Sequence, residues 1–336
     1  MRRVCVAFAA IALLAAPLAA QQKPASKAKY RTARTAWGDP DLSGTYTNKY
    51  EIGTPFEKPD EFAGRNLSDI GPDELKKILA ARQQNQIERL PFVSGDPEGR
   101  IGPPAESREI YNIDKGSRPW FVVDPPDGKI PPQTPDVAKR IAARQAARIA
   151  AGRGRGAADS YEDLSLYNQC VTRGFPGSML PAIYGNSYDI LQGPGYVAIR
   201  YEMIHETRII PLDGRPHVRN DIRFDMGDAR GHWDGDTLVV ETTNFTDRGA
   251  YRNADGATLK LTERFTPAAP DKVEWAVTVD DPHTWTRPWT FSMPLTKDAR
   301  EAVFEYGCHE GNYALRNILS AARAEERDAA ASAARK

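Results

Sequence analysis

The chain has 336 residues, with 45 basic and 45 acidic side chains, and 27% of its residues are charged. This balance gives no reason to expect nucleic acid or an anionic membrane surface as a partner. The 26 glycines and 26 prolines indicate many turns and long loops in a polar chain and exclude a typical membrane protein.

Residues 1–20 have the pattern of a cleavable secretory signal. Arg2 and Arg3 precede an apolar run from Val4 to Leu14, and small residues follow as far as Ala20. The run is shorter than the roughly 18–20 residues that a membrane span needs. We therefore expect a periplasmic or secreted mature protein without a membrane span. Cleavage takes two from the 45 basic residues, leaving 43 against 45 acidic ones.

The next part of the chain, up to residue 160, is predicted to lack a core of its own. Residues 21–35 form a polar, flexible leader, and residues 36–160 form an irregular extension that wraps the outside of the following domain. Apolar residues at helical spacing predict one or two helices in it, at Pro72–Leu90 and Asp136–Ala151. Shorter signals predict a strand at the end of Asp39–Thr47, a strand followed by polyproline-like chain at Phe121–Pro135, and a linker at Gly152–Gly156.

Residues 161–320 are predicted to be the main domain, followed by a polar, alanine-rich tail at 321–336. Strand-like runs recur here at short intervals and are separated by turn residues, which is typical of an antiparallel meander closed into a barrel or folded as a sandwich. The eight runs are Tyr188–Leu191, Tyr196–Tyr201, Thr207–Pro211, Thr237–Asn244, Thr258–Thr266, Lys272–Val279, Trp285–Pro294 and Glu301–Tyr306.

Alternation along two of these runs predicts which side chains face the core. In the run at 272–281, Trp275 and Asp281 share one side with three valines. In the run at 285–293, Trp285, Arg287 and Trp289 share one side. An inward arginine needs an anionic partner, because an unpaired buried charge is costly. Asp281 or a ligand would supply it.

Signal cleavage also removes Cys5 and leaves Cys170 and Cys308. An even pair of cysteines in an oxidising compartment favours a disulfide between them. The alternative is a Cys308 nucleophile in a thiol hydrolase, which would require the thiol to stay reduced outside the cytoplasm.

Several blocks of the sequence resemble an uncharacterised family of exported bacterial proteins that is abundant in acidobacteria. The resemblance covers most of the mature chain and implies export, but it brings no activity, ligand or catalytic residue with it. The blocks are Phe121–Pro135, Ile204–Pro216 (IHETRIIPLDGRP), Gly231–Phe245 (GHWDGDTLVVETTNF), Asp280–Trp289 (DDPHTWTRPW) and Tyr306–Tyr313 (YGCHEGNY).

A second resemblance is to lipocalin-like barrels, whose first strand carries a glycine, any residue and then a tryptophan. Here the pattern is Gly44-Thr45-Tyr46, with tyrosine in the aromatic place and a long insertion after it. The resemblance implies a lipocalin-like barrel with a pocket for a single ligand in its mouth.

Histidine and carboxylate side chains are the candidates for acid–base chemistry, since no cofactor motif is present. Two histidines begin the same dipeptide, His205-Glu206 and His309-Glu310, and a bridged Cys308 would hold the second dipeptide in place. The sequence lacks a nucleophile elbow, a phosphate-binding glycine loop and a dinucleotide fingerprint, which disfavours the common hydrolases, kinases and dehydrogenases.

Metal sites are weaker alternatives. Zinc or iron could be bound by His205, His309 and a carboxylate, although no HExxH or paired-cysteine motif occurs. The aspartates between 225 and 236 do not match an EF-hand loop and fit turns better. We expect neither a metal nor a cofactor.

Two functions remain open from the sequence. The first is a cofactor-free lyase, isomerase or hydrolase that acts on an apolar or aromatic small molecule in a barrel pocket. The second is a lipocalin-like binding protein that holds such a molecule without converting it. The oligomeric state is left open. The candidate catalytic residues are His205, His309, Glu310, Arg208, Arg287 and Asp281, and the candidate ligand-binding residues are Trp275, Trp285 and Trp289.

Overall fold

The computed structural model describes residues 30–89, 117–150, 158–182 and 185–335. The predicted signal, most of the leader and the Gly152–Gly156 linker therefore lie outside the described residues. The strands are β1 (Gly44–Thr47), β2 (Val122–Asp124), β3 (Ser187–Gly193), β4 (Tyr196–Tyr201), β5 (Thr207–Pro211), β6 (Asp228–Asp234), β7 (Thr237–Thr243), β8 (Lys260–Ala269), β9 (Lys272–Asp280) and β10 (Trp289–Lys297), and the helices are α1 (Pro72–Arg89), α2 (Pro135–Ala150) and α3 (Tyr313–Ala334).

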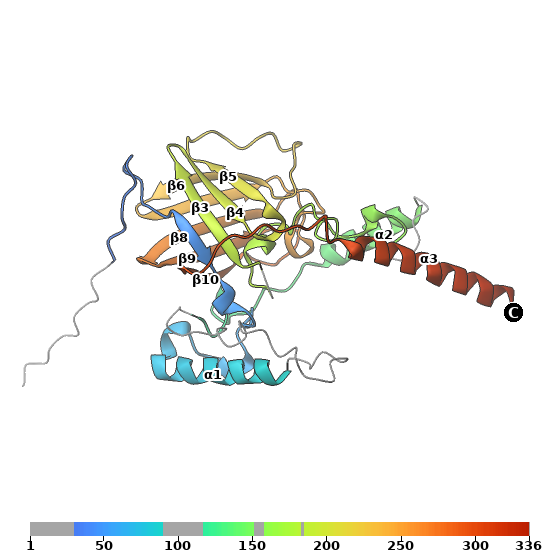
Figure 1. Cartoon of the computed structure of the whole chain (residues 1–336), viewed down its shortest axis with the longest axis horizontal. Helices are drawn as coiled ribbons and strands as arrows, with labels where there is room; N and C mark the ends of the chain where they lie inside the picture. The colour runs from blue at the N-terminus through green and yellow to red at the C-terminus, as the bar shows by residue number, and fades with distance from the viewer. Residues whose placement is uncertain (1–29, 90–116, 151–157, 183–184, 336) are drawn as a thin grey trace, which may run out of the picture. The chain divides into compact units, whose positions relative to one another are not determined.

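The strands of the described residues form one antiparallel sheet that curls around a common core (Figure 1). Nine strands follow one another in the order β5-β4-β3-β1-β10-β9-β8-β7-β6, and β2 pairs with β10 beside that path. The protein is thus mainly β, as the spacing of the strand-like runs predicts, and the sheet is a nearly closed barrel.

Strands β5 and β6 are the two ends of this order, and they approach each other at Gly231. A Cβ atom added at Gly231 would lie 2.8 Å from Cγ2 of Ile210 and 2.6 Å from Cδ2 of Leu212. Glycine therefore lets β6 pack directly against side chains at the end of β5. The barrel is closed here by packing, because no hydrogen-bonded ladder joins these two strands among the described residues.

Alternation places the predicted face of β9 in the core. Val273, Trp275, Val277 and Val279 are all buried, and so is Asp281 just beyond the strand. A fully buried side chain of this size stabilises the fold by about 1.5–3 kcal/mol. The residues between them on β9 are only partly buried, so the period of two is confirmed for this strand.

One predicted strand is missing and one observed strand was not predicted. Glu301–Tyr306 has no strand pairing, whereas β6 was overlooked because Asp228–Asp234 is rich in charged and polar residues. The predicted strand Trp285–Pro294 also begins before the observed strand β10. The strand starts at Trp289, so the alternation proposed from Trp285 does not hold across Pro288.

The N-terminal part contributes to the sheet itself. β1 pairs with both β3 and β10, and its Tyr46 is buried in the main core. Residue 161 therefore does not mark an edge of the sheet, and Thr32–Lys336 forms one compact unit. The two predicted helices correspond to α1 and α2. The predicted tail from residue 321 continues α3, which begins at Tyr313.

A disulfide joins Cys170 to Cys308, with the Cα atoms 5.8 Å apart, as predicted from the even cysteine pair. It connects the chain before β3 to the segment after β10. Among the described residues, no helix is both long and apolar enough to cross a membrane.

Glu51 is a buried carboxyl that follows β1 and makes stability depend on pH. Its Oε2 accepts hydrogen bonds from the Arg118 amide and the Thr54 hydroxyl, both at 3.1 Å, while Oε1 has no partner among the described residues. Burial raises the pKa of Glu51 to about 8. The folded protein therefore binds a proton that the unfolded chain has released between about pH 4.5 and pH 8.

We expect the free energy of unfolding to decrease as the pH rises through that window, because folded Glu51 binds a proton that the unfolded chain has released. The contribution of Glu51 is complete below the pKa of the unfolded chain and falls by about 1.4 kcal/mol per pH unit until the pH passes the folded pKa. Urea unfolding of wild type and Glu51→Gln between pH 5 and pH 8 measures it. The stability difference should move in favour of the variant as the pH rises, and parallel pH profiles would contradict the assignment.

Candidate functional site

The three predicted ligand-binding tryptophans are core residues. Trp275, Trp285 and Trp289 are at most 2% exposed. The rings of Trp285 and Trp289 pack edge to face with centroids 5.6 Å apart, and the indole N–H of Trp275 donates to Glu263 at 3.1 Å. These contacts are those of a packed interior. None of the three lines the clefts described below.

Arg208 is buried in the barrel and has a protein partner. Its guanidinium donates from both Nη atoms to Glu263, which is fully buried on β8, and from Nη2 to the Thr242 hydroxyl at 3.3 Å. Its Cζ lies 4.0 Å from the centroid of the Phe175 ring. Because β5 and β8 are distant in the sheet order, this ion pair spans the barrel interior.

Arg287 and Asp281 do not form the predicted inward pair. Arg287 is half exposed and lies 3.1 Å from Asp124, because it precedes β10 and is free of that strand's alternation. Asp281 is buried and accepts hydrogen bonds from the Thr258 hydroxyl at 2.7 Å and from the amides of Asp255 at 2.8 Å and His283 at 3.0 Å. Through these bonds, Asp281 holds together the loop segments that carry Asp255, Thr258 and His283.

The two predicted catalytic histidines are exposed. Nδ1 of His205 lies 3.1 Å from the carbonyl oxygen of Tyr306, so that His205 contacts the segment that also carries His309 and Glu310. His309 and Glu310 lie on an exposed turn just after Cys308. The structure therefore does not bring the predicted set together, because the histidines are at the surface and the tryptophans are in the core.

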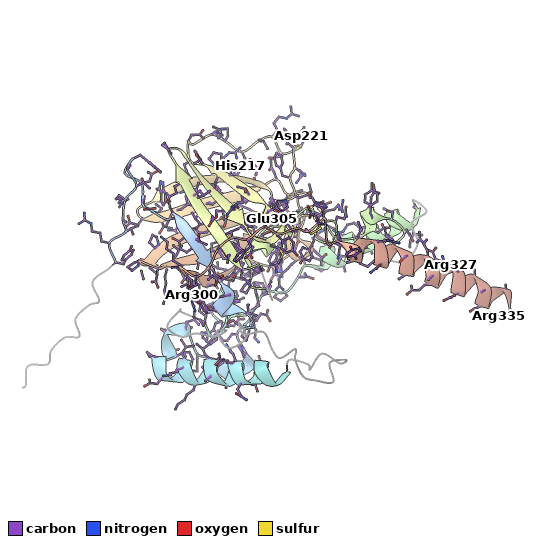
Figure 2. All side chains as sticks on the ribbon, viewed as in Figure 1. His217, Asp221, Arg300, Glu305, Arg327 and Arg335 are labelled. Atoms are coloured by element: carbon purple, nitrogen blue, oxygen red, sulfur yellow. A yellow bond between two sulfur atoms is a disulfide. The ribbon has the colours of Figure 1, made fainter. Side chains whose placement is uncertain are left out.

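The other histidines lie on loops and strands of the second half of the chain. Figure 2 shows His217 and Asp221 on the connection between β5 and β6. Nδ1 of His217 lies 3.0 Å from Asp228. Among the described residues, no group of three histidine, cysteine, aspartate or glutamate side chains is placed to hold a metal ion.

A cleft that the sequence analysis did not predict lies between two loops. We call it the arginine cleft, and its volume is about 210 Å³. Three arginines line it, and no aspartate or glutamate does so among the described residues. Its lining consists of Ser165, Leu166, Tyr167, Thr172, Arg173, Gly174, Phe175, Gly177, Arg248, Gly249, Ala250, Tyr251 and Arg252.

The first wall of the arginine cleft is held by the disulfide and by a buried carboxyl. Cys170 lies within the segment that forms this wall, between Tyr167 and Thr172, and the hydroxyl of Thr172 donates to Glu206 at 2.6 Å while accepting from the Gly174 amide at 2.9 Å. Burial raises the pKa of Glu206, and the hydrogen bond from Thr172 lowers it in part. Phe175 is buried in this wall, and the guanidinium of Arg208 lies over its ring.

The second wall depends on a glycine and on an unusual backbone conformation. A Cβ atom at Gly249 would lie 2.2 Å from the carbonyl oxygen of Asp225, so only glycine fits there. Arg252 has φ 51° and ψ 42°, a left-handed conformation that is uncommon for a residue with a side chain. Such conformations are often concentrated at functional sites.

The three arginines differ in how far the protein satisfies them. Nη1 of Arg173 is buried and has no hydrogen-bond partner among the described residues. Arg248 makes one long hydrogen bond, 3.4 Å, to the carbonyl oxygen of Leu164. Arg252 donates to the Tyr251 hydroxyl at 2.9 Å, and its Cζ lies 4.7 Å from the Phe56 ring centroid. The cleft is therefore a cationic site with unused donors.

A histidine–carboxylate pair follows the second wall in the chain. Nδ1 of His283 lies 3.0 Å from Oδ2 of Asp255, which is three residues beyond Arg252. Burial acts to raise the pKa of Asp255, but the hydrogen bonds from His283 and from the Ala257 amide outweigh it and lower the pKa overall. His283 itself is exposed.

Further clefts lie elsewhere among the described residues. One of about 480 Å³ lies beside the disulfide, and its lining includes Tyr167, Tyr306 and Asn312. Another, of about 230 Å³, lies at Lys58 and Trp120. In that cleft the Lys58 ammonium donates to the carbonyl oxygen of Pro126 at 2.7 Å, which is a contact that supports the turn following β2.

Sequence reasoning missed the arginine cleft because its walls are more than seventy residues apart in the chain. The available signal is that each wall carries an Arg-Gly dipeptide in a loop, Arg173-Gly174 and Arg248-Gly249. Arginine next to glycine in a turn is too common to indicate a site by itself. Only the fold places the two dipeptides in one cleft.

Comparisons with known proteins do not show a family. No protein-family model matches the sequence, and no curated protein matches it. A crystal structure of a secretary abundant heat soluble (SAHS) protein from Ramazzottius varieornatus is similar at 10% sequence identity and a TM-score of 0.24. The match covers 40% of this chain and 87% of that chain.

Proposed function

We propose that the protein is a small-molecule binding protein whose ligand occupies the arginine cleft. The single observation that carries this proposal is the buried Nη1 of Arg173, which has no partner among the described residues and belongs to a residue of the cleft lining. A buried donor without an acceptor costs about 1–3 kcal/mol. An anion paired with the Arg173 guanidinium would offset that cost.

The surroundings of Arg173 support the same function. The cleft combines cationic side chains with the aromatic rings of Tyr167, Phe175 and Tyr251. Ligand sites in proteins are usually concave, largely apolar and furnished with a few polar groups that fix orientation. The site proposed from the sequence, with Trp285, Trp289 and the two histidines in one pocket, is replaced by this cleft.

The place of action that we propose is the periplasm or the outside of the cell, after removal of residues 1–20. The Cys170–Cys308 disulfide supports it, because such bonds persist in oxidising compartments and are rare in the cytosol.

The second candidate is a cofactor-free acid–base enzyme, which the His283–Asp255 pair favours. A histidine hydrogen-bonded to a carboxylate is a common general base, and Asp255 follows the wall that carries Tyr251 and Arg252. In this candidate the acid–base role belongs to His283, not to His205 or His309.

Blocking the cleft should abolish ligand binding without unfolding the protein. Gly177 lines the cleft, has nothing within 4 Å of a built Cβ and does not require a positive φ, so the backbone accepts the side chain of Gly177→Phe. A ligand at one hundred times its Kd adds about 2.7 kcal/mol of stability. It should raise the Tm of wild type by roughly 5 °C, and that of Gly177→Phe by far less.

The measurement is thermal unfolding of the mature chain, residues 21–336, against a panel of neutral, cationic and anionic single-ring compounds. Gly71→Phe is the matched control, since Gly71 is equally open and lies outside the cleft. Ligands that stabilise both variants equally, or a panel without any stabilising compound, would contradict the proposal. Chromatography of each stabilising mixture detects turnover, which would favour the enzyme, and His283→Gln should then abolish it.

A further inference from the structure

We propose that the ligand of the arginine cleft is a small aromatic carboxylate of about the size of benzoate. This inference rests on the proposed function and adds the chemical class of the ligand. Its carboxylate would accept hydrogen bonds from Arg173, and its ring would lie against the apolar part of the lining.

The charge of the cleft lining determines whether the ligand is an anion, a cation or neutral. Arg173, Arg248 and Arg252 line the cleft, and no acidic side chain balances them there among the described residues. Glu206 does not line the cleft, and its carboxyl accepts a hydrogen bond from the Thr172 hydroxyl of the lining. A neutral ligand would leave the three guanidinium groups uncompensated, so an anion is favoured.

The unpaired Nη1 of Arg173 decides where the anion lies. It is the cleft arginine nitrogen that is both buried and without a partner in the described part of the chain. A guanidinium presents two parallel N–H groups that match the two oxygens of a carboxylate. A carboxylate in the cleft would therefore pair with the Arg173 guanidinium through a charge-assisted hydrogen bond, which is stronger than a neutral one.

The remaining lining favours a carboxylate with a ring over inorganic phosphate. Leu166, Phe175, Ala250 and Tyr251 contribute apolar surface that a fully hydrated inorganic anion would not use. Stacking on aromatic side chains stabilises a bound ring by about 0.5–1.5 kcal/mol beyond its buried area.

The volume of the cleft favours a ligand with a single ring over a lipid. The volume of about 210 Å³ corresponds to roughly seven water molecules at about 30 Å³ each. A benzoate-sized ion fits within this space, whereas most of a long-chain fatty acid would extend beyond the lining. The barrel core next to Phe175 is filled by side chains, because Trp275, Phe265 and Phe291 are fully buried and packed together.

Isothermal titration of the mature chain with benzoate, benzamide and inorganic phosphate tests this class. Benzamide has the ring without the charge, and phosphate has the charge without the ring. We expect benzoate to bind with a stoichiometry of one, and benzamide and phosphate to bind at least tenfold more weakly. Arg173→Gln should weaken benzoate binding by about tenfold or more, the size expected for loss of a hydrogen bond to a charged group.

Arg252→Gln is the second variant, in case Arg173→Gln fails to fold, and it should weaken benzoate binding in the same direction. Arg287→Gln is the matched control, because Arg287 is exposed beside Asp124 and outside the cleft. Its benzoate affinity should equal that of wild type. Equal affinity for benzoate and benzamide, tighter binding of phosphate than of benzoate, or loss of affinity in Arg287→Gln would overturn the inference.

Failure of the ligand class can be told apart from failure of the site. If none of the three probes binds while other compounds still stabilise wild type but not Gly177→Phe, the cleft remains the binding site and the aromatic carboxylate is wrong. If no compound distinguishes wild type from Gly177→Phe, the proposed function falls and this inference falls with it.

Discussion

Replacing Arg208 by methionine is expected to lower the free energy of unfolding by about 3–5 kcal/mol, because Glu263 would remain as an uncompensated buried charge. Both side chains are almost completely buried, at 4% and 0% exposure. Glu263 also accepts the indole N–H of Trp275, so it cannot leave the core without breaking a second contact. Equilibrium unfolding in urea, followed by tryptophan fluorescence, measures the loss.

The double variant Arg208→Met, Glu263→Leu should recover much of this stability. A buried ion pair is often no more stabilising than well-packed apolar side chains of similar volume, because desolvation offsets the attraction. The exposed ion pair between Arg287 and Asp124 supplies the control, since Arg287→Met should lower the free energy of unfolding by less than about 1 kcal/mol. An Arg208→Met loss no larger than that of Arg287→Met would show that the buried pair is not important for stability.

Local patterns predicted the barrel strands well, and long-range pairing explains what they missed. The runs Tyr196–Tyr201 and Thr207–Pro211 coincide with β4 and β5, because alternation reports burial directly. β1 is only four residues long, and no local pattern indicates that it lies between β3 and β10. Its place is set by strands that occur more than a hundred residues later, so it could not be assigned from its own sequence.

The candidate site was predicted less well than the fold, for a related reason. The alternation of buried and exposed residues along a strand identified Trp275 as a core residue. It does not apply to loops, and the arginine cleft is built from loops. Arg287 was wrongly placed inside because the start of β10 was set four residues too early, so that the alternation was applied to residues that precede the strand. The cysteine pairing was correct because only one pairing of two cysteines exists.

The disulfide has the other large effect on stability. Cys170 and Cys308 are separated by 138 residues, and closing a loop of that length restricts the unfolded chain strongly. The chain-entropy relation gives about 5 kcal/mol for such a loop. The double variant Cys170→Ser, Cys308→Ser should therefore unfold at a much lower urea concentration than the oxidised wild type.

If the disulfide stabilises the protein by restricting the unfolded chain, all samples without the bond should have the same free energy of unfolding. Wild type treated with a reductant should match the double variant, and the reductant should leave the double variant unchanged, because the bond is the only difference that matters. Since Cys170 lies within the segment that carries Thr172 and Arg173, loss of the bond should also weaken ligand binding in the cleft before the barrel unfolds. A double variant within about 1 kcal/mol of the oxidised wild type would instead mean that the unfolded chain is already compact, with Cys170 and Cys308 held near each other without the bond.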